Sequence, residues 1–281
     1  MGVPEVWDAI ASTYAVDVMP YFALYAEEAL RIAGLGASPV GAAAEHPKGW
    51  DFPGLSGHVL DVACGPGTLA FLAAPRVERV TGVDFSPKMI EEVRARAERE
   101  GVRNLDAEVM DAQALRFADA TFDAAFCLFA FMFFPDRSRA FREMRRVIRD
   151  GSKAGVTTWA PIERRPFIKI GLEAMAEAVP QLPPMPKGDL QEPQACIEEM
   201  TAAGFRDVTT HPFTASVRVD SAEHYLRIME RSGAGFAALR KKIGETNWPR
   251  VYDRLLEAVR RRLPEGGAEL SAEAIVSVGV R

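Results

Sequence analysis

Acidic and very small residues follow the apolar segments in the first half of the chain. One apolar run ends at Asp61 and leads into Ala63, Gly65 and Gly67, and a second run ends at Asp84. Residues without bulky side chains let a ligand lie directly against the main chain. A carboxylate about twenty residues after such a loop is placed to accept hydrogen bonds from a ribose diol. The spacing predicts a binding site for a cofactor that contains a nucleoside.

The glycine run is compatible with two kinds of nucleoside cofactor. The segment from Gly65 to Ala70 also matches the G-x-G-x-x-[GA] pattern of dinucleotide-binding proteins. A carboxylate at Asp61 would repel a pyrophosphate, whereas it would attract a cofactor with an ammonium and a sulfonium group. A third acid, Asp111, follows the next apolar segment. The residues favour S-adenosylmethionine (SAM), and an NAD-dependent dehydrogenase stays open as the less favoured alternative.

At these positions the chain resembles the class I SAM-dependent methyltransferases, in the small-molecule branch that includes the ubiquinone and menaquinone methyltransferases. Asp61-x-Ala63-x-Gly65-x-Gly67 is similar to the first motif of that family, with alanine in place of its first glycine. The resemblance is strong over residues 55–160. It implies an α/β fold with a doubly wound, mostly parallel seven-stranded sheet (Rossmann-like), N-terminal lid helices and a helical insertion before the last strand. The implied parts are lid helices at 1–33, a flexible connector at 34–57, the SAM-binding core at 58–160, and the completion of the sheet at 161–281, with an acceptor-binding helical cap at about 220–265.

The same resemblance implies roles for individual residues. The main chain from Ala63 to Gly67 would face the methionine part of the cofactor, with Asp61 near its ammonium group. Asp84 would hold the ribose hydroxyls, and Asp111 would accept a hydrogen bond from the exocyclic amine of the adenine. The cofactor-binding residues expected in this way are Asp61, Ala63, Cys64, Gly65, Gly67, Asp84, Phe85, Met89, Met110, Asp111, Ala112 and Leu128. The product of the cofactor would be S-adenosylhomocysteine (SAH).

The segment after the fourth expected strand is apolar and aromatic. Amino-directed DNA methyltransferases carry a polar Asp/Asn-Pro-Pro-Tyr/Phe motif there, whereas this chain has Phe129 and Phe133. Such walls suit a flat or apolar acceptor, although buried aromatic residues are common in any core. In the resembled enzymes the N-terminal helices close over the site, and an aromatic ring there shields the methyl group from water. The expected acceptor contacts are Tyr14, Tyr21, Tyr25, Phe129, Phe133 and Trp159.

No residue is assigned as the catalytic base. His211 and His224 lie in the part of the chain expected to bind the acceptor, and an imidazole titrates near neutral pH. Lone histidines are more often structural, so both are weak candidates, and Tyr14 is a third. No metal is expected, because the cysteines share no metal-ligand spacing: they are Cys64, Cys127 and Cys196.

Charge and composition restrict the partners. The chain has 281 residues and a formal net charge of −5, which argues against a nucleic-acid partner. Sparse cysteines suit a reducing cytoplasm, and no signal peptide is recognisable. The most apolar run, 124–134, is too short to span a bilayer, so no stable membrane insertion is expected. We expect a cytoplasmic protein, monomeric or homodimeric, whose partner is a small-molecule acceptor.

Alternating apolar and amphipathic segments predict a parallel, doubly wound sheet. Strands are expected at 58–63, 79–83, 106–110, 122–128, 154–159, 205–219 and 272–280. Helices are expected within 5–33 and at 67–74, 87–100, 136–148, 163–178, 194–203, 221–231, 236–244 and 249–263. Ser86 and Pro87 are typical of the N-cap and the first position of a helix.

Together these patterns predict an enzyme that transfers a methyl group from SAM to O, N or C of a small, largely apolar or aromatic molecule. The reaction would be an in-line displacement, in which alignment of the reactants is the main task of the protein. A protein that uses SAM or SAH without methyl transfer, as a cyclase or a scaffold, is the alternative from a different class. Its cofactor motifs would look the same.

Overall fold

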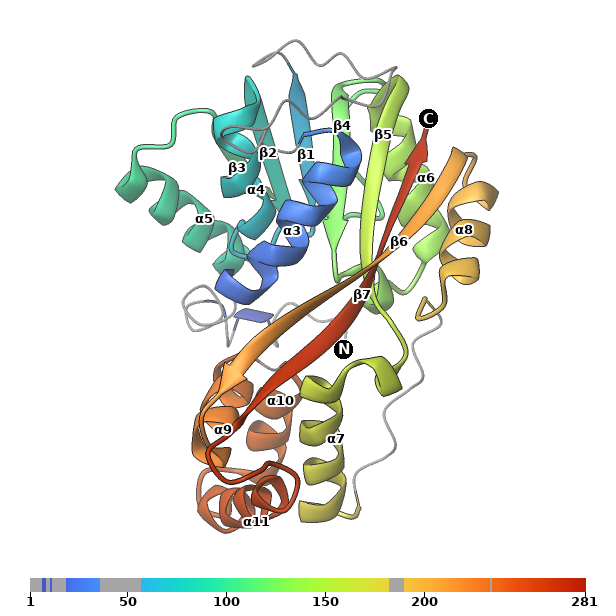
Figure 1. Cartoon of the computed structure of the whole chain (residues 1–281). Coiled ribbons are helices and arrows are strands. Elements are labelled where there is room, and N and C mark those ends of the chain that lie inside the picture. Colours follow the sequence, from blue (N-terminus) through green and yellow to red (C-terminus); the bar gives the residue numbers. More distant parts are fainter. Residues whose placement is uncertain (1–6, 9–10, 12–18, 36–56, 182–189, 233) are drawn as a thin grey trace, which may run out of the picture.

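The computed structural model describes residues 7–8, 11, 19–35, 57–181, 190–232 and 234–281. Its centre is a single seven-stranded sheet in the order β3-β2-β1-β4-β5-β7-β6 (Figure 1). Strands β1 to β5 are parallel, and β7 is antiparallel to both of its neighbours, β5 and β6. The strands are β1 (His58–Val62), β2 (Arg79–Asp84), β3 (Leu105–Val109), β4 (Phe122–Leu128), β5 (Ile148–Trp159), β6 (Arg206–Val219) and β7 (Ala268–Val280).

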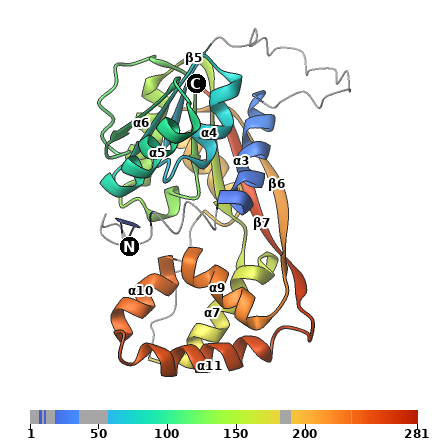
Figure 2. The same ribbon diagram turned by 90° about the vertical axis from the view of Figure 1, so that its left-hand side faces the viewer.

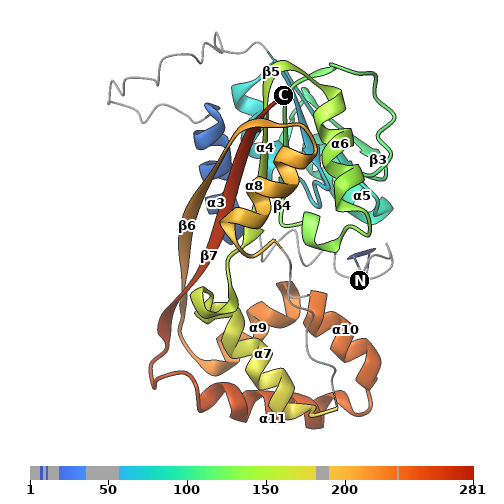
Figure 3. The same cartoon turned by 90° about the vertical axis from the view of Figure 1, so that its right-hand side faces the viewer.

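Helices cover both faces of the sheet, as the alternating pattern predicts. On one face, α3 (Met19–Ala33), α4 (Thr68–Ala73) and α5 (Pro87–Glu100) share a hydrophobic core with the strands. On the other face, α6 (Arg137–Val147) and α8 (Pro193–Ala202) share a second core with them (Figure 3). The predicted cap of α5 is confirmed: the Ser86 hydroxyl accepts a hydrogen bond from the main-chain N–H of Met89 at 3.1 Å.

Strands β6 and β7 continue beyond the sheet as a two-stranded ribbon. The pairing of β5 with β7 ends at Trp159 and Ala274, whereas the pairing of β6 with β7 runs on to Val219 and Ala268. The ribbon leads to a helical module with a core of its own (Figures 1 and 2). This helical module consists of α7 (Pro166–Ala178), α9 (Ala222–Ser232), α10 (Ala234–Ile243) and α11 (Trp248–Arg260).

The helical insertion before the last strand is where the resemblance implies it, but the helical module is larger than the range 220–265. Helix α7 precedes β6 by about thirty residues in the chain, and it packs against α11 with Phe167, Ala174 and Met175 in the shared core. The sequence of an amphipathic helix shows that one face is buried, but it does not show which neighbour covers that face. The sequence therefore could not assign α7 to the helical module.

Helix α3 packs into the core of the sheet. Four of its residues are at most 2% exposed and lie in the core shared with α4 and α5: Ala26, Ala29, Leu30 and Ala33. Helix α3 is therefore anchored in the core, and the expectation of lid helices at 1–33 stays a prediction. The described residues of the earlier part are Trp7, Asp8 and Ala11, and most of the connector expected at 34–57 lies outside the described residues. Among the described helices, none is long and apolar enough to cross a membrane.

Candidate cofactor and acceptor site

A cavity of about 250 Å³ opens at the carboxyl ends of β1, β2 and β4, where a doubly wound sheet binds its ligands. All the residues expected to bind the cofactor line this cavity except Gly67. Its wall has a polar side, formed by the ends of β1 and β2, and an aromatic side, formed after β4. The lining also includes residues that the sequence analysis did not single out: Trp7, Phe22, Pro66, Thr68, Leu69, Gln113, Ala130, Phe134 and Pro135.

The loop after β1 presents its main chain to the cavity. Ala63 and Gly65 both have φ of 53°, in the left-handed region that favours glycine. A Cβ atom added at Gly65 would meet no atom within 4 Å, so space is open beside its main chain. Gly67 differs: an added Cβ would lie 3.0 Å from the Phe71 ring and 3.3 Å from Val93. The small size of Gly67 thus serves helix packing, which explains why it is not part of the cavity wall.

Asp61 is a buried carboxyl group that forms no ion pair with a cationic side chain among the described residues. It is 2% exposed, and its Oδ2 accepts a hydrogen bond from the main-chain N–H of Ala70 at 3.0 Å. Burial, together with the smaller effect of the nearby charge of Asp84, raises the pKa of Asp61 to about 8, while the hydrogen bond opposes the rise. A cationic group in the cavity would reverse this shift, because an opposite charge favours the ionised carboxylate. The site therefore fits a ligand with an ammonium group.

Asp84 ties the loop after β1 to the start of α5. Its Oδ2 accepts from the main-chain N–H of Gly65 at 2.9 Å, and its Oδ1 accepts from the main-chain N–H of Ser86 at 2.9 Å. Burial raises the pKa of Asp84 to about 6, although these hydrogen bonds oppose the rise. Each carboxylate oxygen can accept a further hydrogen bond. The structure thus gives Asp84 a loop-holding role that the sequence analysis did not predict.

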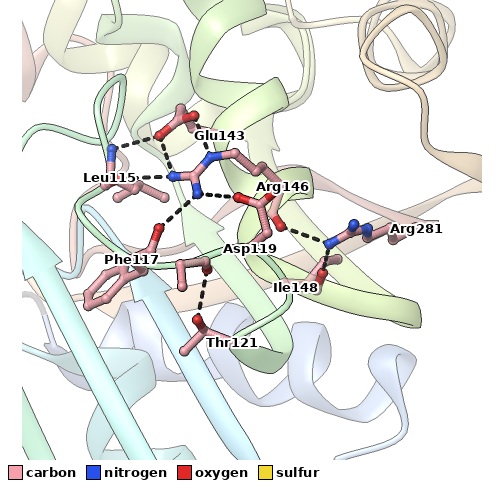
Figure 4. A network of polar contacts seen from close by, with 9 residues as sticks. Leu115, Phe117, Asp119, Thr121, Glu143, Arg146, Ile148 and Arg281 are labelled. Atoms are coloured by element: carbon pink, nitrogen blue, oxygen red, sulfur yellow. Dashed lines mark hydrogen bonds and ion pairs between the residues drawn. The ribbon is translucent and has the colours of Figure 1, made fainter.

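The loop after β3 forms the rim of the cavity and is anchored from behind. The exposed Asp111 accepts from the main-chain N–H of Gln113 at 2.8 Å. Further along the loop, the Arg146 guanidinium donates to the carbonyls of Leu115 and Phe117 (Figure 4). The same guanidinium forms ion pairs with two carboxylates, those of Asp119 and Glu143. This anchor on α6 holds the loop that carries Met110, Asp111 and Ala112 against the cavity.

The aromatic side of the wall combines separate parts of the chain. Phe129 and Phe133 line it as expected, and Trp7 and Phe22 join them. The ring centroids of Trp7 and Phe133 lie 5.4 Å apart, and those of Phe22 and Phe129 lie 4.9 Å apart, both edge to face. Phe22 follows Tyr21 directly in the chain, but a helix turns adjacent side chains about 100° apart, so only one of the two can face the cavity.

Three of the aromatic residues expected to contact the acceptor lie behind this wall. Trp159 stacks on Phe129 with ring centroids 4.1 Å apart, and it does not line the cavity. The buried Tyr25 donates from its hydroxyl to the carbonyl of Ala272 at 2.6 Å, and the Tyr21 and Tyr25 hydroxyls lie 2.7 Å apart. Burial raises the pKa of Tyr25. These two tyrosines fasten α3 to the ribbon of β6 and β7.

The weak catalytic candidates are not brought to the cavity. His211 lies on β6, where its Nε2 is 3.0 Å from the Thr209 hydroxyl, and His224 lies on α9, where its Nδ1 accepts from the main-chain N–H of Asp220 at 3.2 Å. Neither lines the cavity, so the structure gives their prediction as bases no support. Tyr14 lies outside the described residues. The described residues also contain no group of three or more His, Cys, Asp or Glu side chains that could hold a metal ion.

Comparisons with known proteins agree with the site. A methyltransferase domain family matches residues 59–151. Aklanonic acid methyltransferase DauC of Streptomyces sp. (strain C5) is 31% identical over 186 residues, which cover 65% of this chain and 76% of that protein. The uncharacterized protein Rv1405c of Mycobacterium tuberculosis is 38% identical over 138 residues, which cover 49% of this chain and 46% of that protein. The chain thus spans about half the length of such a relative.

A solved structure supports the fold. The crystal structure of the YcgJ protein from Bacillus subtilis superimposes with a TM-score of 0.54 at 20% identity, covering 80% of this chain and 92% of that one. The sheet order with an antiparallel β7, and the acids around the glycine loop, agree with the SAM-type site that the sequence predicts. With the similarity to the Streptomyces enzyme, they show that the chain belongs to the class I SAM-dependent methyltransferases.

Proposed function

We propose that this protein transfers the methyl group of SAM to O, N or C of a small, largely apolar or aromatic molecule. The observation that carries the proposal is the two-sided cavity, with Asp61 and Asp84 on one side and Phe129 and Phe133 on the other. The polar side suits the charged and hydroxylated parts of SAM, and the aromatic side suits a flat acceptor.

On this proposal the cofactor is held by the residues expected from the sequence. Asp61 receives the ammonium group, the main chain at Ala63 and Gly65 lies against the methionine part, and Asp84 accepts from the ribose hydroxyls. Asp111 on the rim receives the exocyclic amine of the adenine. When bound, SAM supplies an electrophilic methyl group on a sulfonium. The buried carboxyl group of Asp61 supports this assignment, because a bound ammonium group would favour its ionised form and reverse the rise of its pKa.

The acceptor would be aligned by the aromatic wall. Phe129 and Phe133 give it flat, apolar contacts, and Trp7 and Phe22 exclude water from the same space. Alignment of this kind is worth on the order of 7 to 11 kcal/mol of a displacement barrier. Within the described part of the chain, no histidine lines the cavity. This favours an acceptor that needs little help to lose a proton, such as a phenolate or a carboxylate oxygen or an activated carbon.

The partner class follows from the same features. The net charge of −5 and the size of the cavity favour a small molecule over a nucleic acid. The Streptomyces relative is named for a single organic acid, which agrees with an acceptor of that scale. We expect the protein to act in the cytoplasm.

Methyl transfer is tested with methyl-labelled SAM and a panel of phenols, aromatic acids and quinols. Label in an extracted product, together with SAH formed in equal amount, is the expected result. Binding of SAM and SAH without any labelled product across the panel, and without SAH formation in cell extract, would favour the cyclase or scaffold alternative. A matched control is Gly65→Val, which is expected to lose both signals because it fills the space beside the loop.

A further inference from the structure

The side chain of Gln113 connects two parts of the cavity wall. It follows Asp111 by two residues in the loop after β3, it is half buried, and it lines the cavity. Its amide nitrogen Nε2 donates to Oδ1 of Asp111 at 3.1 Å and lies 3.4 Å from Oδ2. Its amide oxygen Oε1 accepts from the main-chain N–H of Asp136 at 2.8 Å. One side chain thus joins the loop after β3 to the segment that follows β4.

The two partners of Gln113 determine both its residue type and the orientation of its amide. An ionised carboxylate can only accept hydrogen bonds, so the amide nitrogen must face Asp111. A main-chain N–H can only donate, so the amide oxygen must face Asp136. A glutamate here could not donate to Asp111 and would repel it, and a lysine or arginine could not accept from Asp136. Both bonds together therefore need a glutamine.

The first bond orients the carboxylate that we assign to the adenine. Oδ1 of Asp111 accepts from the main-chain N–H of Gln113 at 2.8 Å as well as from its side chain, whereas the side-chain contact with Oδ2 is longer. The terminal torsion of an aspartate is soft, so an exposed carboxylate can rotate unless its hydrogen bonds hold it. Two donors on Oδ1 hold the plane of this carboxylate, and they leave Oδ2 the more available to an exocyclic amine.

The second bond holds the end of the aromatic segment. Phe134 donates its main-chain N–H to a carbonyl of the short helix η2 (Phe131–Phe133), and Pro135 has no N–H. The N–H of Asp136 is therefore the first one after η2 to bind another element, and its acceptor is Gln113. Asp136 is also the N-cap of α6. Because Phe134 and Pro135 line the cavity, the position of this part of the wall depends on Gln113.

We propose that Gln113 is a positioning residue, which makes the cofactor site selective for adenine and couples its occupancy to the aromatic side of the cavity. This inference rests on the proposed function, because it requires SAM or SAH to place its adenine at Asp111. The amine of the adenine donates to Oδ2 while Gln113 holds Oδ1, and the same amide keeps Asp136 in place. Hypoxanthine has a carbonyl oxygen where adenine has the amine, and the carboxylate would repel that oxygen.

The first test measures selectivity for the base. SAH and S-inosylhomocysteine, whose base is hypoxanthine, are titrated by calorimetry into the wild type, Gln113→Met and Gln194→Met. We expect the wild type to bind SAH at least about tenfold more tightly than the inosyl analogue, since one charge-assisted hydrogen bond distinguishes them. Gln113→Met can neither donate nor accept, so this ratio should fall by about threefold or more.

The control Gln194→Met should keep the ratio of the wild type. Gln194 also donates its amide to a carboxylate, that of Glu198 at 3.0 Å, but it lies on α8 and does not line the cavity. Loss of a glutamine that only stabilises the loop would weaken the binding of both ligands equally. An unchanged ratio in Gln113→Met would therefore overturn the inference, and so would equal affinities of the wild type for the two ligands.

The second test measures the coupling. Hydrogen exchange of the Asp136 N–H is followed by mass spectrometry of peptides that span 134–136, with and without SAH. We expect SAH to slow this exchange in the wild type by at least about threefold. Gln113→Glu keeps the acceptor and loses the donor, so exchange should match the wild type without SAH but should not respond to it. A response that persists in Gln113→Met would overturn the coupling, whereas failure of SAH to bind the wild type would contradict the proposed function.

Discussion

The polar side and the aromatic side of the cavity are built in different ways. At the sheet edge, the main chain of the loop after β1 and two carboxylates, Asp61 and Asp84, form the polar side of the cavity. On the aromatic side, the side chains come from Trp7, from α3 and from the segment after β4. Main-chain recognition needs small residues at set spacing, and it therefore leaves a motif. Recognition by side chains on separate elements leaves none.

The rim of the cavity and the helical module differ in how they are fastened to the sheet. The rim of the cavity is held by Arg146 and by the hydrogen bonds of Asp84, within the sheet and its own helices (Figure 4). The helical module is joined to the sheet by the ribbon of β6 and β7, which α3 fastens through Tyr21 and Tyr25. Removal of α3 should therefore affect both the cavity and the helical module. Substitutions in the loop after β1 should affect the cavity alone.

Removal of residues 1–33 is expected to have the largest effect. Helix α3 buries Tyr25 and Leu30 completely, and burial of one large apolar side chain is worth about 1.5–3 kcal/mol, against a typical total stability of about 5–15 kcal/mol. We expect the truncated protein to lose its cooperative unfolding transition by circular dichroism. Trp7→Ala, in contrast, should fold normally and bind SAH more weakly, since Trp7 lines the cavity. A folded, active truncation would show that α3 is a detachable lid after all.

Gly65→Val should abolish cofactor binding in a folded protein. The added side chain enters the space beside the loop. Because residue 65 has φ of 53°, a residue other than glycine costs about 1–2 kcal/mol of stability there. Gly101→Val is the matched control, because Gly101 has φ of 69° and open space but caps α5 away from the cavity. Both variants should lower the unfolding midpoint similarly, and only Gly65→Val should lose SAH binding in calorimetry. Equal affinity of the two would mean that the ligand does not lie on this loop.

Asp84→Ala should weaken SAH binding by about 1–3 kcal/mol, because buried ribose hydroxyls lose their acceptor. The variant also frees the main-chain N–H groups of Gly65 and Ser86, so its unfolding free energy should fall as well. Asp106→Ala, which removes an exposed carboxylate paired with Arg79, provides the control and should leave both quantities nearly unchanged. Wild-type affinity in Asp84→Ala would contradict the placement of the ribose.

The affinity for SAH should rise with pH. The folded-state pKa of Asp61 is about 8, above the usual value of about 3.9. In the free, folded protein its carboxyl group is therefore mostly protonated below a pH of about 8. The raised pKa stabilises the folded state at low pH, and this contribution is lost as the pH rises from about 4 to 8. Binding of an ammonium group needs the ionised form and releases a proton. We expect at least roughly tenfold tighter binding at pH 8 than at pH 6, and no such dependence in Asp61→Asn.

Replacement of either histidine should have the smallest effect. His211→Ala and His224→Ala change residues that do not line the cavity, so methyl transfer should stay within about twofold of the wild type. The loss of His224 removes one hydrogen bond near the start of α9, and only a small change in the unfolding midpoint is expected. A hundredfold loss of turnover in either variant, with unchanged stability, would show that the replaced histidine takes part in catalysis.

The sheet could be predicted from the sequence because the patterns that indicate its strands are local. Apolar runs that end in Asp61 and Asp84, and the Ser86 cap, depend only on nearby residues, and the structure has the corresponding elements within a few residues. The largest departures are the earlier start of β5, at Ile148, the earlier start of β7, at Ala268, and the packing of α7 in the helical module. Those depend on which apolar faces meet, and the residue types alone do not specify that.

The site was predictable to a different degree on its two sides. The polar residues follow from the motif, although Gly67 serves packing against Phe71 instead of the cavity. On the aromatic side, Tyr21, Tyr25 and Trp159 have the residue types of a binding wall but support it from behind. Whether a buried aromatic ring faces a cavity or a core depends on the angle at which its helix packs, as Phe22 beside Tyr21 illustrates.

The central claim is that the carboxyl edge of the sheet binds SAM. Parallel calorimetric titrations of the purified protein with SAM, SAH and NAD test it most directly. We predict micromolar binding of SAM and SAH and no response to NAD. Binding of NAD alone would mean that the glycine loop accepts a pyrophosphate beside Asp61, and it would contradict the assignment.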